Sequence, residues 1–138
     1  MAVLKDQSFE DTSVLVAVEH PASAQLLTDR LERRGVNTER VQDGNDALDI
    51  VDNASLDIMV AQTRLPGRTG LELLRQVPHL DPATILLGRE GNDEVIVRAF
   101  EFGAADYITR PFSPRIAVAR ILRFLTLPVA ASSEAAPR

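Results

Sequence analysis

The sequence predicts an α/β fold, with five strands in one parallel sheet and helices on both of its faces. Short apolar runs, typical of strands buried on both sides, alternate with longer stretches in which apolar residues recur at helical spacing. Glycine or proline ends several of the helical stretches. Strands that alternate with helices favour a parallel sheet, because each parallel pair needs a crossover connection.

Five strand–helix units account for the chain from about Ser13 to Leu127. The expected strands span residues 13–18, 37–41, 56–62, 84–88 and 106–109. The expected helices span residues 21–35, 44–53, 69–77, 92–103 and 113–125.

The first two units differ in the strength of their strands. The run SVLVAV is strongly apolar and leads to a helix that has apolar residues at helical spacing and stops at Gly35. The second strand, NTERV, is weaker. It is assigned because it leads to Asp43 and to a helix with Ala47, Leu48 and Val51 on one face.

The last three units have clearer boundaries. The strand LDIMVAQ precedes the helix TGLELLRQV, which Pro78 ends, and the strand TILLG precedes the helix NDEVIVRAFEFG, which closes at Gly103. The short strand DYIT is followed by the helix SPRIAVARILRFL. Pro21 and Pro114 both fall in the first turn of an expected helix, where a missing N–H costs nothing, so these prolines support the boundaries.

The composition is that of one globular domain and excludes several functions. The chain has 138 residues, of which 45% are hydrophobic and 25% charged, and its net charge is -5, which argues against direct nucleic acid or membrane binding. No cysteine is present, and no segment is apolar enough to span a bilayer, so we expect a cytoplasmic protein. We expect residues 1–12 to be flexible, residues 13–127 to form the domain, and residues 128–138 to be a disordered tail or linker.

Four segments resemble the receiver domain of response regulators, in the family's order and spacing. They are SVLVAVEHP, VQDGNDALDIV, LDIMVAQTRLPGRTGLELLRQV and FEFGAADYITRPFSP. The last third of the chain looks most like the OmpR-like branch. The resemblance implies a CheY-like (flavodoxin-like) three-layer sandwich with strand order 2-1-3-4-5 and a working site at the carboxyl ends of the strands.

The residues at the implied site differ from those of a working receiver. In the family, an aspartate accepts a phosphoryl group, two further acids help to hold Mg²⁺, a hydroxyl residue senses the phosphoryl group, and a lysine contacts it. The resemblance places Gln62 at the nucleophile, Val18 and Glu19 at the acid pair, Gly88 at the hydroxyl residue and Arg110 at the lysine.

These substitutions predict that the phosphorylation pocket is vestigial. An amide is a poor nucleophile, and the loss of two of three carboxylates lowers the charge available to Mg²⁺ from about -3 to about -1. We therefore expect no enzyme activity, no metal and no cofactor. We expect Glu19 and Arg110 to form an ion pair that fills the pocket; the alternative is an anion pocket around Arg110, with help from Arg89.

The resemblance also marks two features away from the pocket. Tyr107 occupies the position of the family's switch aromatic, and opposite Gly88 we expect either a ring locked in one orientation or an ordinary core aromatic. The surface that OmpR-like receivers use for two-fold dimers is formed here by the helix 92–103, the strand 106–109 and the helix 113–125. Its expected residues are Ile96, Arg98, Glu101, Asp106, Ile116, Arg120 and Arg123.

The dimer surface contains two apolar residues where the branch often has an opposite-charge pair. They are Ile96 and Ile116, and a symmetric patch that contains them favours a dimer that forms without phosphorylation. The alternative is that Ile96 faces the sheet, as part of the apolar stripe of its helix.

The leading hypothesis is a phosphorylation-independent pseudo-receiver, a homodimeric module that binds an unidentified protein partner in signalling or transcription control. A second hypothesis is a sensor that binds a small anion or metabolite in the vestigial pocket. An active receiver that uses an unusual residue is the third.

Overall fold

The computed structural model describes residues 9–77, 82–89 and 93–126 and confirms the α/β fold. Its five strands are β1 Ser13–Ala17, β2 Asn37–Val41, β3 Ile58–Gln62, β4 Ala83–Arg89 and β5 Asp106–Arg110. All neighbouring strands are parallel, in the order β2-β1-β3-β4-β5. The helices are α2 Pro21–Arg33, α3 Gly44–Asn53, α4 Gly70–Gln76, α5 Asp93–Glu101 and α6 Pro114–Thr126.

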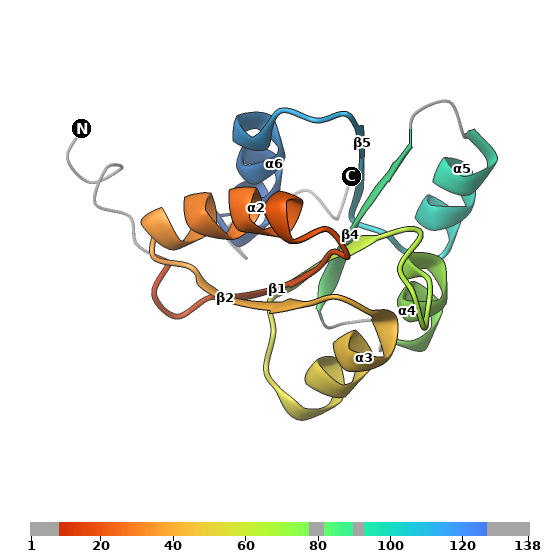
Figure 1. The fold of residues 1–138 in the computed structure, drawn as a ribbon, viewed down its shortest axis with the longest axis horizontal. Helices are drawn as coiled ribbons and strands as arrows, with labels where there is room; N and C mark the ends of the chain where they lie inside the picture. Colours follow the sequence, from red (N-terminus) through yellow and green to blue (C-terminus); the bar gives the residue numbers. More distant parts are fainter. Residues whose placement is uncertain (1–8, 78–81, 90–92, 127–138) are drawn as a thin grey trace, which may run out of the picture.

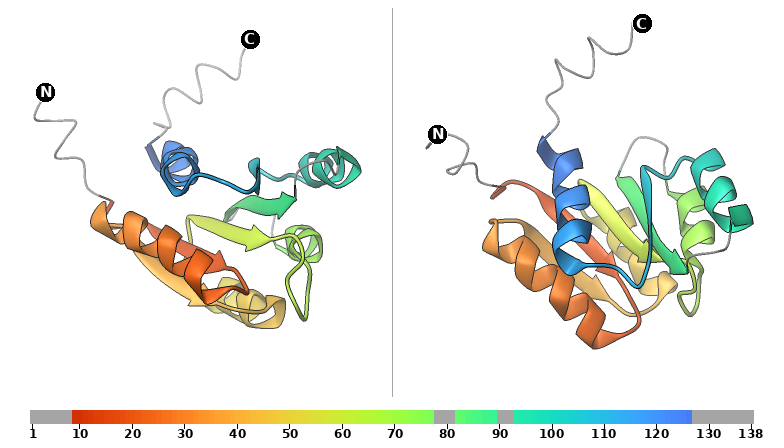
Figure 2. Two further views of the ribbon diagram at one scale, coloured as in Figure 1. Left: turned by 45° about the horizontal axis from the view of Figure 1, so that its top comes forward. Right: turned by 90° about the horizontal axis from the view of Figure 1, so that it is seen from above.

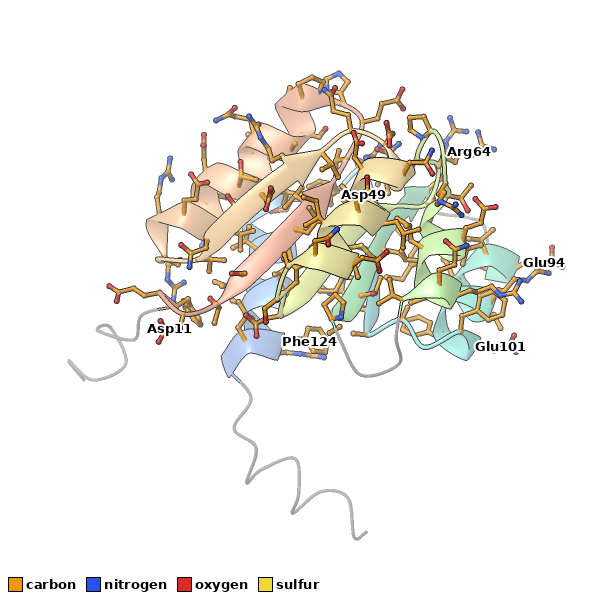
Figure 3. All side chains as sticks on the ribbon, turned by 90° about the horizontal axis from the view of Figure 1, so that it is seen from below. Asp11, Asp49, Arg64, Glu94, Glu101 and Phe124 are labelled. Atoms are coloured by element: carbon orange, nitrogen blue, oxygen red, sulfur yellow. The ribbon has the colours of Figure 1, made fainter. Side chains whose placement is uncertain are left out.

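The helices form one layer on each side of the sheet (Figures 1 and 2). Successive strand residues point to opposite faces, so Val14 and Val16 join the apolar cluster under α2 and α6. Leu15 and Ala17 join the cluster under α3, α4 and α5. A view of this second face shows Glu94 and Glu101 of α5 pointing away from the sheet (Figure 3). The central strands β1, β3 and β4 are therefore mainly apolar because both of their faces are covered, whereas the edge strand β2 is polar and has no buried residue.

Residues 9–12, expected to belong to a flexible N-terminus, are packed against the domain instead. Phe9 is buried in the cluster under α2 and α6. The backbone N–H of Thr12 donates to the Phe9 carbonyl over 2.9 Å, and the Asn37 side chain donates to the carbonyls of Glu10 and Thr12. The expectation for residues 9–12 was wrong because it did not count Phe9 as a core residue. The expectations for residues 1–8 and 128–138 fall outside the described residues.

The loop between β3 and α4 lies against the start of α3, and this contact requires a glycine. The N–H of Gly44 donates to the Pro66 carbonyl over 2.8 Å. A Cβ added at Gly44 would lie 2.1 Å from the Arg68 carbonyl oxygen, so no other residue fits without movement of the backbone. Asp43 caps α3, and Thr69 and Glu72 form a capping box at α4. The loop that follows Gln62 is thereby held at Pro66 and at Thr69.

No helix in the described part of the chain is both long enough and apolar enough to cross a bilayer.

Candidate functional site

The five residues of the predicted pocket lie at one edge of the sheet, because the carboxyl ends of parallel strands meet there. Val18 and Glu19 follow β1 directly, and Gln62 is the last residue of β3. Gly88 lies next to the end of β4, and Arg110 ends β5. The pairing register sets Gln62 beside Leu87 and Gly88 beside Thr109. The sequence therefore placed these five residues at the correct edge of the sheet. The contacts among them decide what chemistry this edge can support.

The side chain of Gln62 joins two loops. Its Oε1 accepts a hydrogen bond from the backbone N–H of Glu19 over 3.0 Å, and its Nε2 donates to the Arg64 carbonyl over 3.1 Å. An amide can accept and donate at once, whereas an ionised carboxylate has no proton to donate to Arg64. A neutral amide therefore suits this position better than the aspartate of a working receiver does.

Replacing Gln62 by methionine tests this bridge. We expect Gln62→Met to lower the free energy of unfolding by about 1–2 kcal/mol, since it removes two hydrogen bonds and keeps a side chain of similar length. The control is Gln42→Met, because Gln42 is exposed, and we expect it to change stability by less than about 0.5 kcal/mol. Urea unfolding measures both. Equal losses in the two variants would show that the bridge contributes nothing.

Tyr107 lies inside the domain, with its hydroxyl over Gly88. Only 6% of the residue is exposed, and it belongs to the cluster under α3, α4 and α5. A Cβ added at Gly88 would lie 1.9 Å from the phenol oxygen and 2.9 Å from the Thr63 hydroxyl oxygen. Burial raises the pKa of Tyr107, and a side-chain hydrogen bond with Thr63 partly offsets this. The phenol thus crosses β4 above Gly88 to reach Thr63 at the end of β3.

The residues at the acid positions do not fit a divalent cation. Val18 is completely buried in the cluster under α2 and α6, and its side chain has no oxygen. The Gln62 amide oxygen already accepts the hydrogen bond from Glu19, which leaves the exposed Glu19 as the only carboxylate. In the described ranges, no three histidine, aspartate or glutamate residues are grouped as metal ligands would be. A hard cation such as Mg²⁺ requires several oxygen ligands, which these side chains do not supply.

The expected ion pair between Glu19 and Arg110 does not form. Among the described residues no carboxylate lies within salt-bridge distance of Arg110, and its Nη2 is buried without a hydrogen-bond partner. Glu19 is exposed while its backbone is held by Gln62, so its side chain points into solvent. Arg89, named in the alternative anion pocket, is exposed at the end of β4. The pocket therefore contains a buried guanidinium nitrogen that the sequence assigned to an ion pair.

Three of the residues expected on the dimer surface make contacts within the chain. Asp106 and Arg120 form a bidentate pair within the chain, with N–O distances of 2.9 and 3.0 Å, and Asp106 Oδ1 also accepts from the Tyr107 N–H. Ile96 is partly buried against the sheet, as the alternative interpretation held. Ile116 is 60% exposed.

Two exposed apolar residues of α5 were not predicted from the sequence. Val97 and Phe100 of α5 are 55% and 47% exposed. The signal was present in the letters VIVRAF, which contain more apolar residues than one buried face of a short helix can use. Arg98 and Glu101 are exposed on the same helix. Arg123 lies over the ring of Phe124, 4.9 Å from its centre.

Comparison with known proteins gives a consistent result. Residues 14–122 match the family described as the response regulator receiver domain. The BeF3-activated receiver domain of DrrB is 29% identical, with a TM-score of 0.76 over 84% of this chain and 98% of that domain. A longer DrrB chain from Thermotoga maritima, described as an OmpR/PhoB homolog, is 29% identical with a TM-score of 0.75. The match covers 83% of this chain and 52% of the DrrB chain. Chemotaxis protein CheY4 of Vibrio cholerae, at 22% identity and a TM-score of 0.75, shares the fold.

Proposed function

The chain belongs to the response regulator receiver family, and from that premise we propose that it acts without phosphorylation, as a protein-interaction module in signalling or transcription control. The observation that carries the proposal is the side chain of Gln62. It stands where the family has its nucleophile, and both ends of its amide are engaged in hydrogen bonds.

The neighbours of Gln62 support the same proposal. An acyl phosphate forms when a carboxylate oxygen attacks phosphorus, and a neutral amide oxygen is a far weaker nucleophile. Val18 and Glu19 together provide one carboxylate, which is too few for a metal site. The negative charge of an incoming phosphoryl group would therefore not be neutralised by a metal ion. Gly88 has no hydroxyl with which to contact a phosphoryl oxygen. We infer that the protein is not an enzyme and that it acts by binding other proteins through its surface.

Exposure to phosphodonors tests the proposal. Incubation with acetyl phosphate or beryllofluoride plus Mg²⁺ is expected to leave the mass of the protein and the fluorescence of Tyr107 unchanged. The DrrB receiver domain, which BeF3 activates, is the positive control. We expect Gln62→Asp alone to remain unmodified as well, because Val18 and Gly88 still provide no metal ligand and no hydroxyl. Saturable phosphorylation of the unaltered chain would overturn the proposal.

We further propose that the module works as a homodimer through the α5–β5–α6 surface, which comprises the outer sides of α5 and α6 and the edge strand β5 between them. Phe100 and Ile116 give this surface exposed apolar area on both helices. A two-fold axis would bring each patch onto its copy. Arg98 and Glu101 are exposed beside it with opposite charges, so one copy's arginine can pair with the other's glutamate. Asp106 and Arg120 pair within each chain and orient α6 against β5.

Ile116→Glu is expected to weaken this dimer about a hundredfold. Two copies of the residue lie at a two-fold interface, and the loss of roughly 1.5 kcal/mol of apolar burial at each amounts to a factor of that size. Leu26→Glu on α2 is the matched control, because Leu26 is 50% exposed on a helix outside the surface. Sedimentation measures the dissociation constant. A dimer that persists in Ile116→Glu, or that dissociates equally in Leu26→Glu, would exclude this interface.

A second candidate function is favoured by the buried Nη2 of Arg110. Its Nη2 has no hydrogen-bond partner, and a small anion in the vestigial pocket would supply one. Thermal unfolding with added phosphate, sulfate or acetate tests this, since a ligand at 100 times its dissociation constant stabilises by about 2.7 kcal/mol. The stabilisation should be lost in Arg110→Ala. No stabilisation by any of the three anions, or equal stabilisation in that variant, would exclude the pocket as their site.

A further inference from the structure

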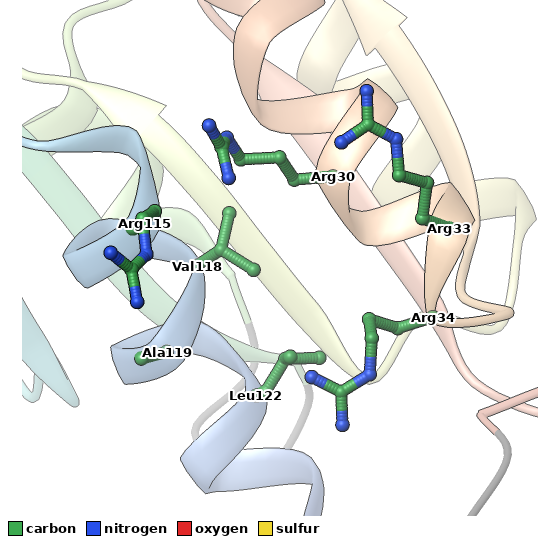
Figure 4. Close-up of a pocket in the computed structure, with 7 residues that line it drawn as sticks. All are labelled: Arg30, Arg33, Arg34, Arg115, Val118, Ala119 and Leu122. Atoms are coloured by element: carbon green, nitrogen blue, oxygen red, sulfur yellow. The ribbon is translucent and has the colours of Figure 1, made fainter.

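A groove of about 260 Å³ between α2 and α6 is surrounded by arginine side chains (Figure 4). Arg30 and Arg34 reach from the α2 side toward α6, which contributes Arg115 (Figure 4). The residues that line the groove are Arg30, Arg33, Arg34, Arg115, Val118, Ala119 and Leu122. The lining thus contains four positive charges and no carboxylate, in a chain whose net charge is -5.

None of these four arginines forms a salt bridge with another residue that the structure describes. The one salt bridge between described residues joins Arg120 and Asp106, on another side of α6. Arg34 instead lies over the ring of Phe9, 5.6 Å from its centre. Guanidinium groups stay ionised at all ordinary pH values. The groove therefore carries a fixed positive charge.

Helix dipoles do not explain the positions of all four arginines of the groove. Arg30 and Arg33 lie in the last turn of α2, where positive charge is favoured. Arg115 lies in the first turn of α6, where positive charge is disfavoured and no acidic residue offsets it. The like charges on the two helices also repel each other across the groove. An anion between them would remove this repulsion.

We propose that the groove binds the diphosphate or triphosphate group of a small metabolite. The planar guanidinium group donates two parallel hydrogen bonds to phosphate oxygens, and several such groups around one space match the charge of a chain of phosphates. Ligand pockets are usually larger, about 300–1,000 Å³, so the groove suits a compact group. Val118 and Leu122 are buried, which leaves little apolar surface for a partner helix. The acidic composition argues against the groove as part of a surface that binds nucleic acid.

The position of the groove relates it to the α5–β5–α6 surface. Arg115 and Ala119 also line a second groove, together with Ile116 and Arg120. An anion held by Arg115 would thus lie close to the proposed dimer contact while leaving the pocket around Gln62 untouched. Binding to the arginine groove requires neither the dimer nor the absence of phosphorylation, so it can be tested independently of both.

Isothermal titration of the full chain with inorganic pyrophosphate and tripolyphosphate tests the proposal. We expect one site per chain, tighter binding of these probes than of orthophosphate or sulfate at matched ionic strength, and unchanged binding in Ile116→Gln, which removes apolar area from the dimer surface without adding a charge beside Arg115. The double variant Arg30→Ala, Arg115→Ala should bind tripolyphosphate about tenfold or more weakly, since it removes a guanidinium from each side of the groove. Circular dichroism verifies that the variant is folded.

Two matched variants separate this site from other positive charge. Arg75→Ala removes an exposed arginine from α4, on the opposite face of the sheet, and should change the affinity by less than about twofold. Arg110→Ala tests the vestigial pocket. The proposal fails if tripolyphosphate does not bind, if the double variant binds as well as the unaltered chain, or if Arg75→Ala or Arg110→Ala causes the same loss. Tighter binding of an oligoglutamate than of tripolyphosphate would also overturn it, in favour of an acidic protein partner.

Discussion

Gly88→Thr will force the ring of Tyr107 out of the domain. A Cβ at position 88 would lie 1.9 Å from the phenol oxygen and 2.7 Å from the ring carbon that carries it, so the side chain of Tyr107 has to move. We expect the free energy of unfolding to fall by about 1–3 kcal/mol, as is typical of overpacked cores. The pKa of Tyr107 should also fall toward its ordinary value of 10.0, because burial is the main cause of its elevation.

Titration of the phenol measures this displacement directly, because Tyr107 is the only tyrosine of the chain. A pKa that is higher in the folded state than in the unfolded state stabilises the fold fully below the unfolded value, and this contribution is lost as the pH rises through the folded value. The unaltered protein should therefore lose stability above about pH 10, and Gly88→Thr should lose less of it there.

A double-mutant cycle provides the control for Gly88→Thr. In a Tyr107→Ala background the ring is absent, so the same substitution at Gly88 should cost much less than it does in the unaltered chain. An equal cost in both backgrounds, together with an unchanged phenol titration, would show that the approach of Tyr107 to Gly88 does not limit this position.

Gly44→Ala is expected to lower the free energy of unfolding by about 3 kcal/mol, which is large for the addition of one methyl group. The new Cβ would lie 2.1 Å from the Arg68 carbonyl oxygen and 2.7 Å from the carbonyl carbon. Backbone atoms cannot turn away as a flexible side chain can, so the loop after β3 must separate from α3. The hydrogen bond from the Gly44 N–H to Pro66 would be broken as a result.

Gly103→Ala separates this clash from the general cost of replacing a glycine. Gly103 has a φ of +103°, which alanine adopts with strain, but nothing lies within 4 Å of a Cβ added there. We expect Gly103→Ala to cost about 1 kcal/mol. Urea unfolding of both variants compares the two effects, and a smaller loss in Gly44→Ala than in Gly103→Ala would show that the loop yields easily.

Most of the fold could be predicted from the sequence because each unit carries its own local signals. The apolar run of β3 and the capping residues Asp43 and Thr69 mark element boundaries without reference to the rest of the chain. The errors come from packing between distant segments. Phe9 has no regular pattern around it, and its burial depends on a surface that α2 and α6 build together.

The candidate site was predictable in its location and less so in its contacts. The position of Gln62 at the end of a strand follows from the sequence, whereas its bonds to Glu19 and Arg64 depend on how two loops approach each other. The ion pair of Glu19 with Arg110 failed for the same reason, since opposite charges at neighbouring strand ends need side chains that converge. Ile96 shows the limit of position-by-position comparison, because the rotation of its helix decides which residues face outward.

The bridge made by Gln62 consists of one side-chain amide, one backbone N–H and one carbonyl, so it contains nothing that gains or loses a proton near neutrality and nothing that water hydrolyses on a cellular timescale. Under the proposed function, which needs no phosphorylation, no half-life of a modified state would set how long the signal of such a receiver lasts. The strength of its output would then follow the number of copies that the cell makes, and synthesis and degradation would take the place of kinase and phosphatase.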